Sequence, residues 1–195
     1  EACDSRITDV VISNNSVTGI GGGMRVFNGS NPELIGVSIS NNTSTSNGGG
    51  IAYEGLPAST INQRLHRVTI SNNTSTEGVG GGIYLYSSIA SVTRSLVQDN
   101  AASLKGGGMS IEWASELMLE NSFVSGNTLT NGVQGSNVYI GKSDQLIGSN
   151  EKLITMNSNL IDTVALSDEN LFSMYTNGLV KPLLINSIAI GRLDA

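Results

Sequence analysis

Apolar and polar residues alternate in short stretches along this chain, and the stretches return at a regular interval. The clearest marker of the interval is an Asn that follows an Ile or Val by three positions. Its five copies are Asn15, Asn42, Asn73, Asn100 and Asn127, called the anchors below, and they are spaced by 27, 31, 27 and 27 residues. A repeat of this period predicts a stacked fold in which each unit buries its apolar side against its neighbours.

Each anchor stands at the same place in a pattern of apolar positions. Residues three and eight positions before it are apolar in every copy, and two further apolar positions follow the glycines after it. These columns are Ile12, Ile39, Ile70, Val97 and Val124; Ile7, Leu34, Leu65, Val92 and Leu119; Met24, Ile51, Ile83, Met109 and Val138; and Val26, Tyr53, Leu85, Ile111 and Ile140. Because side chains on a strand alternate between two faces, the pattern predicts strands whose columns share one core.

The spacing of these strands predicts an all-β parallel β-helix, a solenoid with three strands in each coil of about 27 residues. We expect residues 1–145 to form the coils. From about Gly148 the glycines disappear. We therefore expect residues 146–195 to form a degenerate last coil and a C-terminal cap, because a solenoid exposes unpaired strand edges at its ends.

The anchors and the glycines have a structural explanation. An inward Asn amide donates to one neighbouring coil and accepts from the other, so the column predicts a ladder of amides. A buried amide without such partners would cost about 1–3 kcal/mol. Asn also tolerates the unusual backbone angles of a tight turn. The triple glycines, such as Gly48–Gly50, predict a corner with positive φ where a β-carbon would clash.

Two runs, Ser40–Ile51 and Ser71–Ile83, carry Ser-Asn-Asn-Thr-Ser-Thr before Gly-Gly-Gly-Ile. They resemble the right-handed parallel β-helix repeats of bacterial surface proteins, such as polymorphic outer-membrane proteins and autotransporter passengers. Those repeats carry a Gly-Gly-Ala/Gly-Ile motif and a Phe-x-x-Asn motif, which Phe123–Asn127 only approximates. The resemblance covers residues 5–145 and implies a right-handed coil in a bacterial secreted or cell-surface protein. Its motif residues build the coil, so it says less about function.

Composition narrows the classes of function. The net charge is -6 with no basic cluster, which disfavours nucleic acid as a partner. No stretch approaches the roughly 18 consecutive apolar residues of a membrane-spanning helix. The chain has one cysteine, Cys3, and no spacing of His, Cys or Asp that suggests a metal site. We therefore expect no cofactor and no metal.

Outward positions after the glycines combine aromatic and charged residues. The glycan-binding candidates are Arg25, Phe27, Tyr84, Tyr86 and Trp113, whose rings would stack on sugars. Glu54 and Glu112 are weak catalytic candidates. They lie two coils apart, about 9–10 Å between backbones, near the upper end of the roughly 6.5–9.5 Å separation in inverting glycosidases.

Two other outward groups suggest binding. A Thr-x-Thr column after the anchors resembles the flat threonine array of β-solenoid antifreeze proteins, although Ala101 interrupts it. The ice-binding candidates are Thr18, Thr43, Thr45, Thr74, Thr76, Thr128 and Thr130. A basic group, Arg64, His66, Arg67 and Arg94, suggests a site for a small anion or an acidic glycan.

The sequence favours a secreted or cell-surface scaffold or adhesin-like domain, which binds a partner or glycan without catalysis. Two alternatives stay open: an ice-binding protein, and a polysaccharide-acting lyase or hydrolase. The corresponding partners are an extracellular polysaccharide, a surface protein or ice. The long excursions at residues 28–33 and 54–63 are the expected contact loops.

Overall fold

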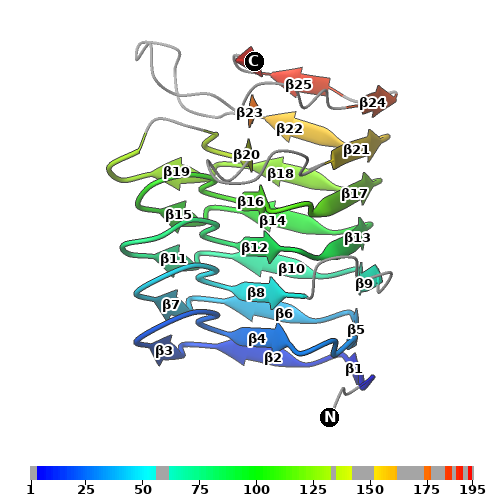
Figure 1. Ribbon diagram of the computed structural model, residues 1–195. Helices are drawn as coiled ribbons and strands as arrows, with labels where there is room; N and C mark the ends of the chain where they lie inside the picture. The colour runs from blue at the N-terminus through cyan, green and yellow to red at the C-terminus, as the bar shows by residue number, and fades with distance from the viewer. Residues whose placement is uncertain are drawn as a thin grey trace.

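The computed structural model describes residues 4–55, 62–132, 135–141 and 152–161, and four short strands between residues 174 and 194. Every regular element in these parts of the chain is a β-strand. Strands of successive coils pair in parallel, so the coils stack into a rod with the N-terminus at one end (Figure 1). The architecture is the parallel β-solenoid predicted from the repeat, with the right-handed coil that the resemblance implies.

The strands form four parallel sheets. Sheet A contains β1 (Arg6–Thr8), β5 (Glu33–Ile35), β9 (Asn62–His66), β13 (Ile89–Thr93), β17 (Glu116–Glu120), β21 (Lys152–Met156) and β24 (Leu183–Ile185). Sheet B contains β2 (Val11–Ser13), β6 (Ser38–Ser40), β10 (Thr69–Ser71), β14 (Leu96–Gln98), β18 (Phe123–Ser125), β22 (Asn159–Ile161) and β25 (Ile188–Ile190). Sheet C contains β3 (Ser16–Val17), β7 (Thr43–Ser44), β11 (Thr74–Ser75), β15 (Ala101–Ala102) and β19 (Thr128–Leu129). Sheet D contains β4 (Met24–Phe27), β8 (Ile51–Glu54), β12 (Ile83–Tyr86), β16 (Met109–Glu112), β20 (Val138–Gly141), β23 (Met174–Thr176) and β26 (Leu193–Asp194).

Each of the first five coils supplies four strands, so the prediction of three is wrong. The sequence pattern places the residues eight and three before the anchor on one strand, but a turn separates them. The turn residue, six before the anchor, is left-handed with φ of 50–63° in Asp9, Gly36, Arg67, Arg94 and Asn121. A single left-handed residue bends the chain between sheets A and B and shifts the apolar alternation by one position. Leu34 and Val37, three residues apart across this corner, are therefore both buried.

The anchors form the predicted ladder. Asn42, Asn73, Asn100 and Asn127 are fully buried. From Asn15 onward, Nδ2 of each anchor donates to Oδ1 of the next at 2.9–3.0 Å, and the same Oδ1 accepts the backbone N–H of the preceding anchor at 3.0 Å. The left-handed turn residue is not the anchor, as the sequence suggested, but the residue before it, such as Asn41 or Asn72.

The three glycines of each coil serve different purposes. The first has positive φ, 58–75° in Gly21, Gly48, Gly80, Gly106 and Gly135, which confirms the predicted corner. The second is required by the close approach of neighbouring coils, since a β-carbon on Gly49 would lie 2.5 Å from the Gly81 carbonyl oxygen. The third leaves room for the ladder, and a β-carbon there on Gly50 would lie 3.0 Å from Asn73 Nδ2.

Among the described residues β19 is the last strand of sheet C, while the other three sheets have further strands. Here Gly135-Ser136-Asn137 replaces Gly-Gly-Gly. Asn137 Oδ1 accepts from Asn127 Nδ2 at 2.8 Å and from the Asn127 backbone N–H at 3.4 Å. Asn137 therefore gives Asn127 the acceptor that a following anchor would otherwise supply, and it ends the ladder without an unpaired amide.

Serines form a second ladder that the sequence reasoning missed. The backbone N–H of Val68 donates to Ser95 Oγ at 2.9 Å, that of Ser95 to Ser122 Oγ at 3.2 Å, and that of Ser122 to Ser158 Oγ at 3.1 Å. These serines follow the corner between sheets A and B, where the first coils have valine. The backbone N–H groups of this corner are thus satisfied inside the wall of the rod.

The predicted apolar columns fill one continuous core that runs from Ile7 in the first coil to Ile140 in the fifth. Beyond it, β21 to β26 extend sheets A, B and D by two strands each. The cap predicted within residues 146–195 falls largely outside the described residues.

Candidate functional site

The last residues of four consecutive sheet D strands form a row outside the solenoid. Phe27, Glu54, Tyr86 and Glu112 are paired in register, one per coil, so neighbouring positions are about 4.7–4.9 Å apart along the rod. Phe27 is 49% exposed and the other three are half-buried. These four residues, together with Arg25 and Trp113, are called the strip below.

Contacts within the strip hold its aromatic rings. The ring centroids of Tyr86 and Trp113 are 5.4 Å apart with a tilt of 43°. Trp113 is left-handed, with φ of 54°, in the turn that follows β16. The Arg25 guanidinium lies 5.2 Å from the centre of the Phe27 ring. Rings packed in this way keep an aromatic surface in place for a flat ligand.

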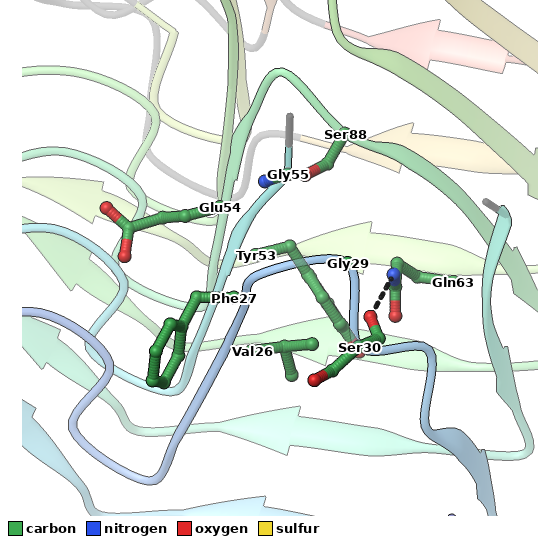
Figure 2. A pocket seen from close by; sticks show the side chains of 9 residues that line it. All are labelled: Val26, Phe27, Gly29, Ser30, Tyr53, Glu54, Gly55, Gln63 and Ser88. Atoms are coloured by element: carbon green, nitrogen blue, oxygen red, sulfur yellow. Dashed lines mark hydrogen bonds between the residues drawn. The ribbon is translucent and has the colours of Figure 1, made fainter. Parts of the chain in front are cut away.

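The two carboxylates of the strip lie on either side of Tyr86. Glu54 forms an ion pair with Arg25, and Glu112 Oε1 accepts from Ser110 Oγ at 3.1 Å. Glu54 and Phe27 border a small cavity whose described lining does not include Glu112 (Figure 2). Glu54 therefore borders this cavity, whereas Glu112 is bonded to Ser110 on the other side of Tyr86.

Tyr84 occupies the predicted register between Ala52 and Ser110, on the face of sheet D that points away from the core. It is nevertheless only 5% exposed. Val79 and Ile20, from segments that link sheets C and D, pack in a second apolar cluster with Ala52 and Tyr84. Burial, then the nearby Glu112, Tyr86 and Glu54, raises the pKa of Tyr84 well above its usual range. Tyr84 therefore packs in this cluster against Tyr86 of the strip and offers no face to a ligand.

The threonine column has the predicted register, with Thr43, Thr74, Ala101 and Thr128 paired in sheet C. Its strands are two residues long, and some hydroxyls are used within the fold. Thr45 Oγ1 accepts the Gly19 N–H at 2.9 Å, and Thr76 Oγ1 donates to the Ser44 carbonyl at 3.3 Å. The exposed members are Thr18, Thr76, Thr128 and Thr130, while Thr43, Thr45 and Thr74 are half-buried. The column is less uniform than a flat threonine array.

The basic residues lie on sheet A and at its corner with sheet B, in two neighbouring coils. Arg64 Nε lies 3.5 Å from Glu33, and His66 Nδ1 lies 2.8 Å from Thr93 Oγ1. Arg67 and Arg94 occupy the left-handed corner between sheets A and B. Two of the four side chains therefore already have partners on sheet A.

Within the described part of the chain, no three His, Cys, Asp or Glu side chains are grouped to hold a metal ion. The same residues include no helix with the length and apolar character needed to cross a membrane.

Comparison with known proteins agrees with the geometry. A family model described as a right-handed β-helix region matches residues 4–160. Comparison with curated proteins gave no significant match, and neither did comparison with solved structures. The matched span includes all five four-stranded coils, and the chain belongs to the right-handed β-helix family.

Proposed function

We propose that this chain is a secreted or cell-surface scaffold, adhesin-like in role, whose strip binds a polysaccharide without cleaving it. Membership of the β-helix family supports a scaffold or polysaccharide-related role. The observation that carries the finer proposal is the in-register order Phe27, Glu54, Tyr86, Glu112, in which rings and carboxylates alternate from coil to coil.

The chemistry of the strip suits a sugar chain lying along the rod. Aromatic faces stack on the apolar C–H faces of sugar rings, and carboxylate oxygens accept hydrogen bonds from sugar hydroxyls. Phe27 and Tyr86 are two coils apart, about 9–10 Å by strand spacing. A linear glycan would meet a ring, a carboxylate and a second ring in turn.

The test is a glycan array of neutral and acidic oligosaccharides, followed by calorimetric titration with any oligosaccharide that binds. We expect Tyr86→Ala to weaken binding by about tenfold or more, the effect of losing an aromatic anchor. Phe123→Ala is the matched control, because Phe123 is 36% exposed on sheet B, away from the strip. Absence of any binding, or equal losses in the two variants, would refute a role for the strip.

Catalysis is tested separately with the same bound oligosaccharide. We expect no new reducing ends and no unsaturated products after long incubation with the protein. Cleavage that Glu54→Gln or Glu112→Gln abolishes would replace the scaffold by a polysaccharide-acting enzyme.

The second candidate is ice binding, which the register of Thr43, Thr74 and Thr128 favours. We rank it below glycan binding because Ala101 interrupts the column and several hydroxyls are engaged within the fold. Its test is thermal hysteresis beside a Thr45→Tyr/Thr76→Tyr variant. Faceted ice growth that the variant abolishes would reverse the ranking.

A further inference from the structure

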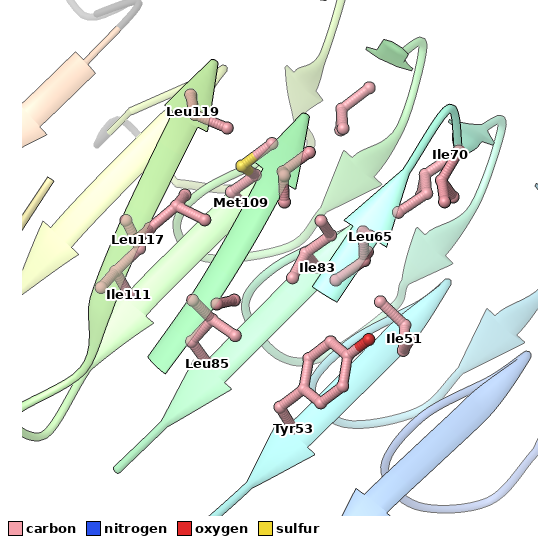
Figure 3. Packing of buried hydrophobic residues seen from close by; sticks show 14 of the residues in the cluster. Ile51, Tyr53, Leu65, Ile70, Ile83, Leu85, Met109, Ile111, Leu117 and Leu119 are labelled. Atoms are coloured by element: carbon pink, nitrogen blue, oxygen red, sulfur yellow. The ribbon is translucent and has the colours of Figure 1, made fainter. Parts of the chain in front are cut away.

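Two polar side chains enter the core where neighbouring coils have apolar ones. Tyr53 shares its column with Val26, Leu85, Ile111 and Ile140. Figure 3 shows its ring and hydroxyl among apolar core side chains such as Ile51 and Leu85. Gln63 shares its column with Ala90 and Leu117. Tyr53 is 1% exposed and Gln63 is 6% exposed. Buried polar groups require partners.

Each of these side chains has one polar atom without a hydrogen-bonding partner in the described part of the chain. Gln63 Nε2 donates to the Ser30 carbonyl at 2.9 Å. This bond fixes the orientation of the amide, since its oxygen cannot donate to a carbonyl. Gln63 Oε1 and the Tyr53 hydroxyl have no hydrogen-bonding partner among the described protein atoms.

The two residues that carry these groups line the same cavity. It has a volume of about 10 Å³ and is also lined by Gly29, Ser30 and Ser88. Figure 2 shows Tyr53 and Gln63 on the inner side of the wall, with Phe27 and Glu54 on the other side. A volume of about 10–15 Å³ is what a single buried water needs, together with two to four polar partners.

We propose that this cavity is a binding site for one ordered water molecule that links Tyr53 to Gln63. The water accepts from the Tyr53 hydroxyl and donates to Gln63 Oε1. The site joins the turn after β4 to strands β8 and β9, and it does not depend on what the strip binds.

The electrostatics agree with these roles. Burial raises the pKa of the Tyr53 hydroxyl far above its usual range, so this group stays protonated and acts as a donor. Gln63 Oε1 is an acceptor only. A water molecule satisfies both, since it accepts and donates at once.

A high-resolution crystal structure of the wild-type protein is the first test. We expect a density peak within hydrogen-bonding distance of both Tyr53 Oη and Gln63 Oε1. The peak should persist in Tyr86→Phe, a matched control outside the core, and disappear in the double variant Tyr53→Phe/Gln63→Met. A dry cavity, or a direct hydrogen bond between Tyr53 and Gln63, would overturn the proposal.

Thermal unfolding gives an independent readout. Tyr53→Phe and Gln63→Met should each lower Tm, because each leaves the other polar group with an incomplete network. The double variant should lose less than the sum of the two, since removing both partners also removes the unmet hydrogen bond. Strictly additive losses would contradict a shared water. If a variant does not fold, the wild-type density still decides the question.

Discussion

Substitution of Asn73 by alanine tests the central ladder most directly. Asn73 Oδ1 accepts from both the backbone N–H and Nδ2 of Asn42 at 3.0 Å. Its Nδ2 donates to Asn100 Oδ1 and to the Ile39 carbonyl, both at 2.9 Å. Alanine removes all four hydrogen bonds at a site that is fully buried.

The expected loss follows from the groups left without a partner. The Asn42 N–H loses its acceptor, Asn42 Nδ2 keeps only its bond to the Ile12 carbonyl, and the Ile39 carbonyl loses its side-chain donor. Asn100 Oδ1 still accepts the backbone N–H of residue 73. At about 1–3 kcal/mol for each unsatisfied buried group, we expect a loss of about 3–6 kcal/mol. For a chain of this size, Tm should fall by about 6–24 °C.

Asn15→Ala is the matched control, with the same substitution in the same column. Asn15 is exposed, and Asn42 Oδ1 would still accept the backbone N–H of residue 15, so the loss should stay within about 1 kcal/mol. Circular dichroism gives Tm, and hydrogen exchange at the Asn42 N–H reports the site itself. A loss in Asn73→Ala no larger than in Asn15→Ala, with Asn42 still protected, would refute the ladder as a source of stability.

Two further predictions concern the end of the ladder and the buried tyrosines. Asn137→Gly restores the glycine of the other coils but removes the acceptor of Asn127 Nδ2, so we expect a loss of about 1–3 kcal/mol, measured as a lower Tm and faster exchange of the Asn127 N–H. An unchanged Tm would contradict the role of Asn137. Burial raises the pKa of Tyr53 and Tyr84 in the folded state, so their contribution to stability is complete below the ordinary tyrosine pKa of about 10 and is lost as pH rises above it. Tyrosinate absorbance of these two residues should appear together with the loss of strand signal, and full ionisation of all tyrosines in the folded protein would contradict their burial.

The features that could be predicted from the sequence are those that repeat in every coil. The register of all four sheets and the partners of Asn42, Asn73 and Asn100 follow from one repeated pattern, because equivalent residues in stacked coils pair with one another. The exceptions to the pattern were harder to interpret. Asn137 stands where a glycine was expected, and its role as the acceptor for Asn127 depends on a contact within the same coil.

The sequence predicted the alignment of the candidate residues in a row, but it did not predict which of them are exposed. Phe27, Glu54, Tyr86 and Glu112 were aligned correctly from their distance to the glycines. The burial of Tyr84 was not foreseen, because alternation assigns a side chain to a face and cannot say whether a later segment covers it. That cover comes from Ile20 and Val79, whose positions depend on the path between sheets C and D.

The sequence by itself determined the coil, its period, the inward columns and the amide ladder, since each depends on residues that repeat at fixed spacing. Only the tertiary structure decided the number of strands per coil, because the left-handed residue that separates sheets A and B varies in type among the coils and leaves no repeated signal. It also decided which outward residues reach solvent, and which polar atoms of Tyr53 and Gln63 are buried without a hydrogen-bonding partner among the described residues. These outcomes depend on contacts between coils that no single repeat contains.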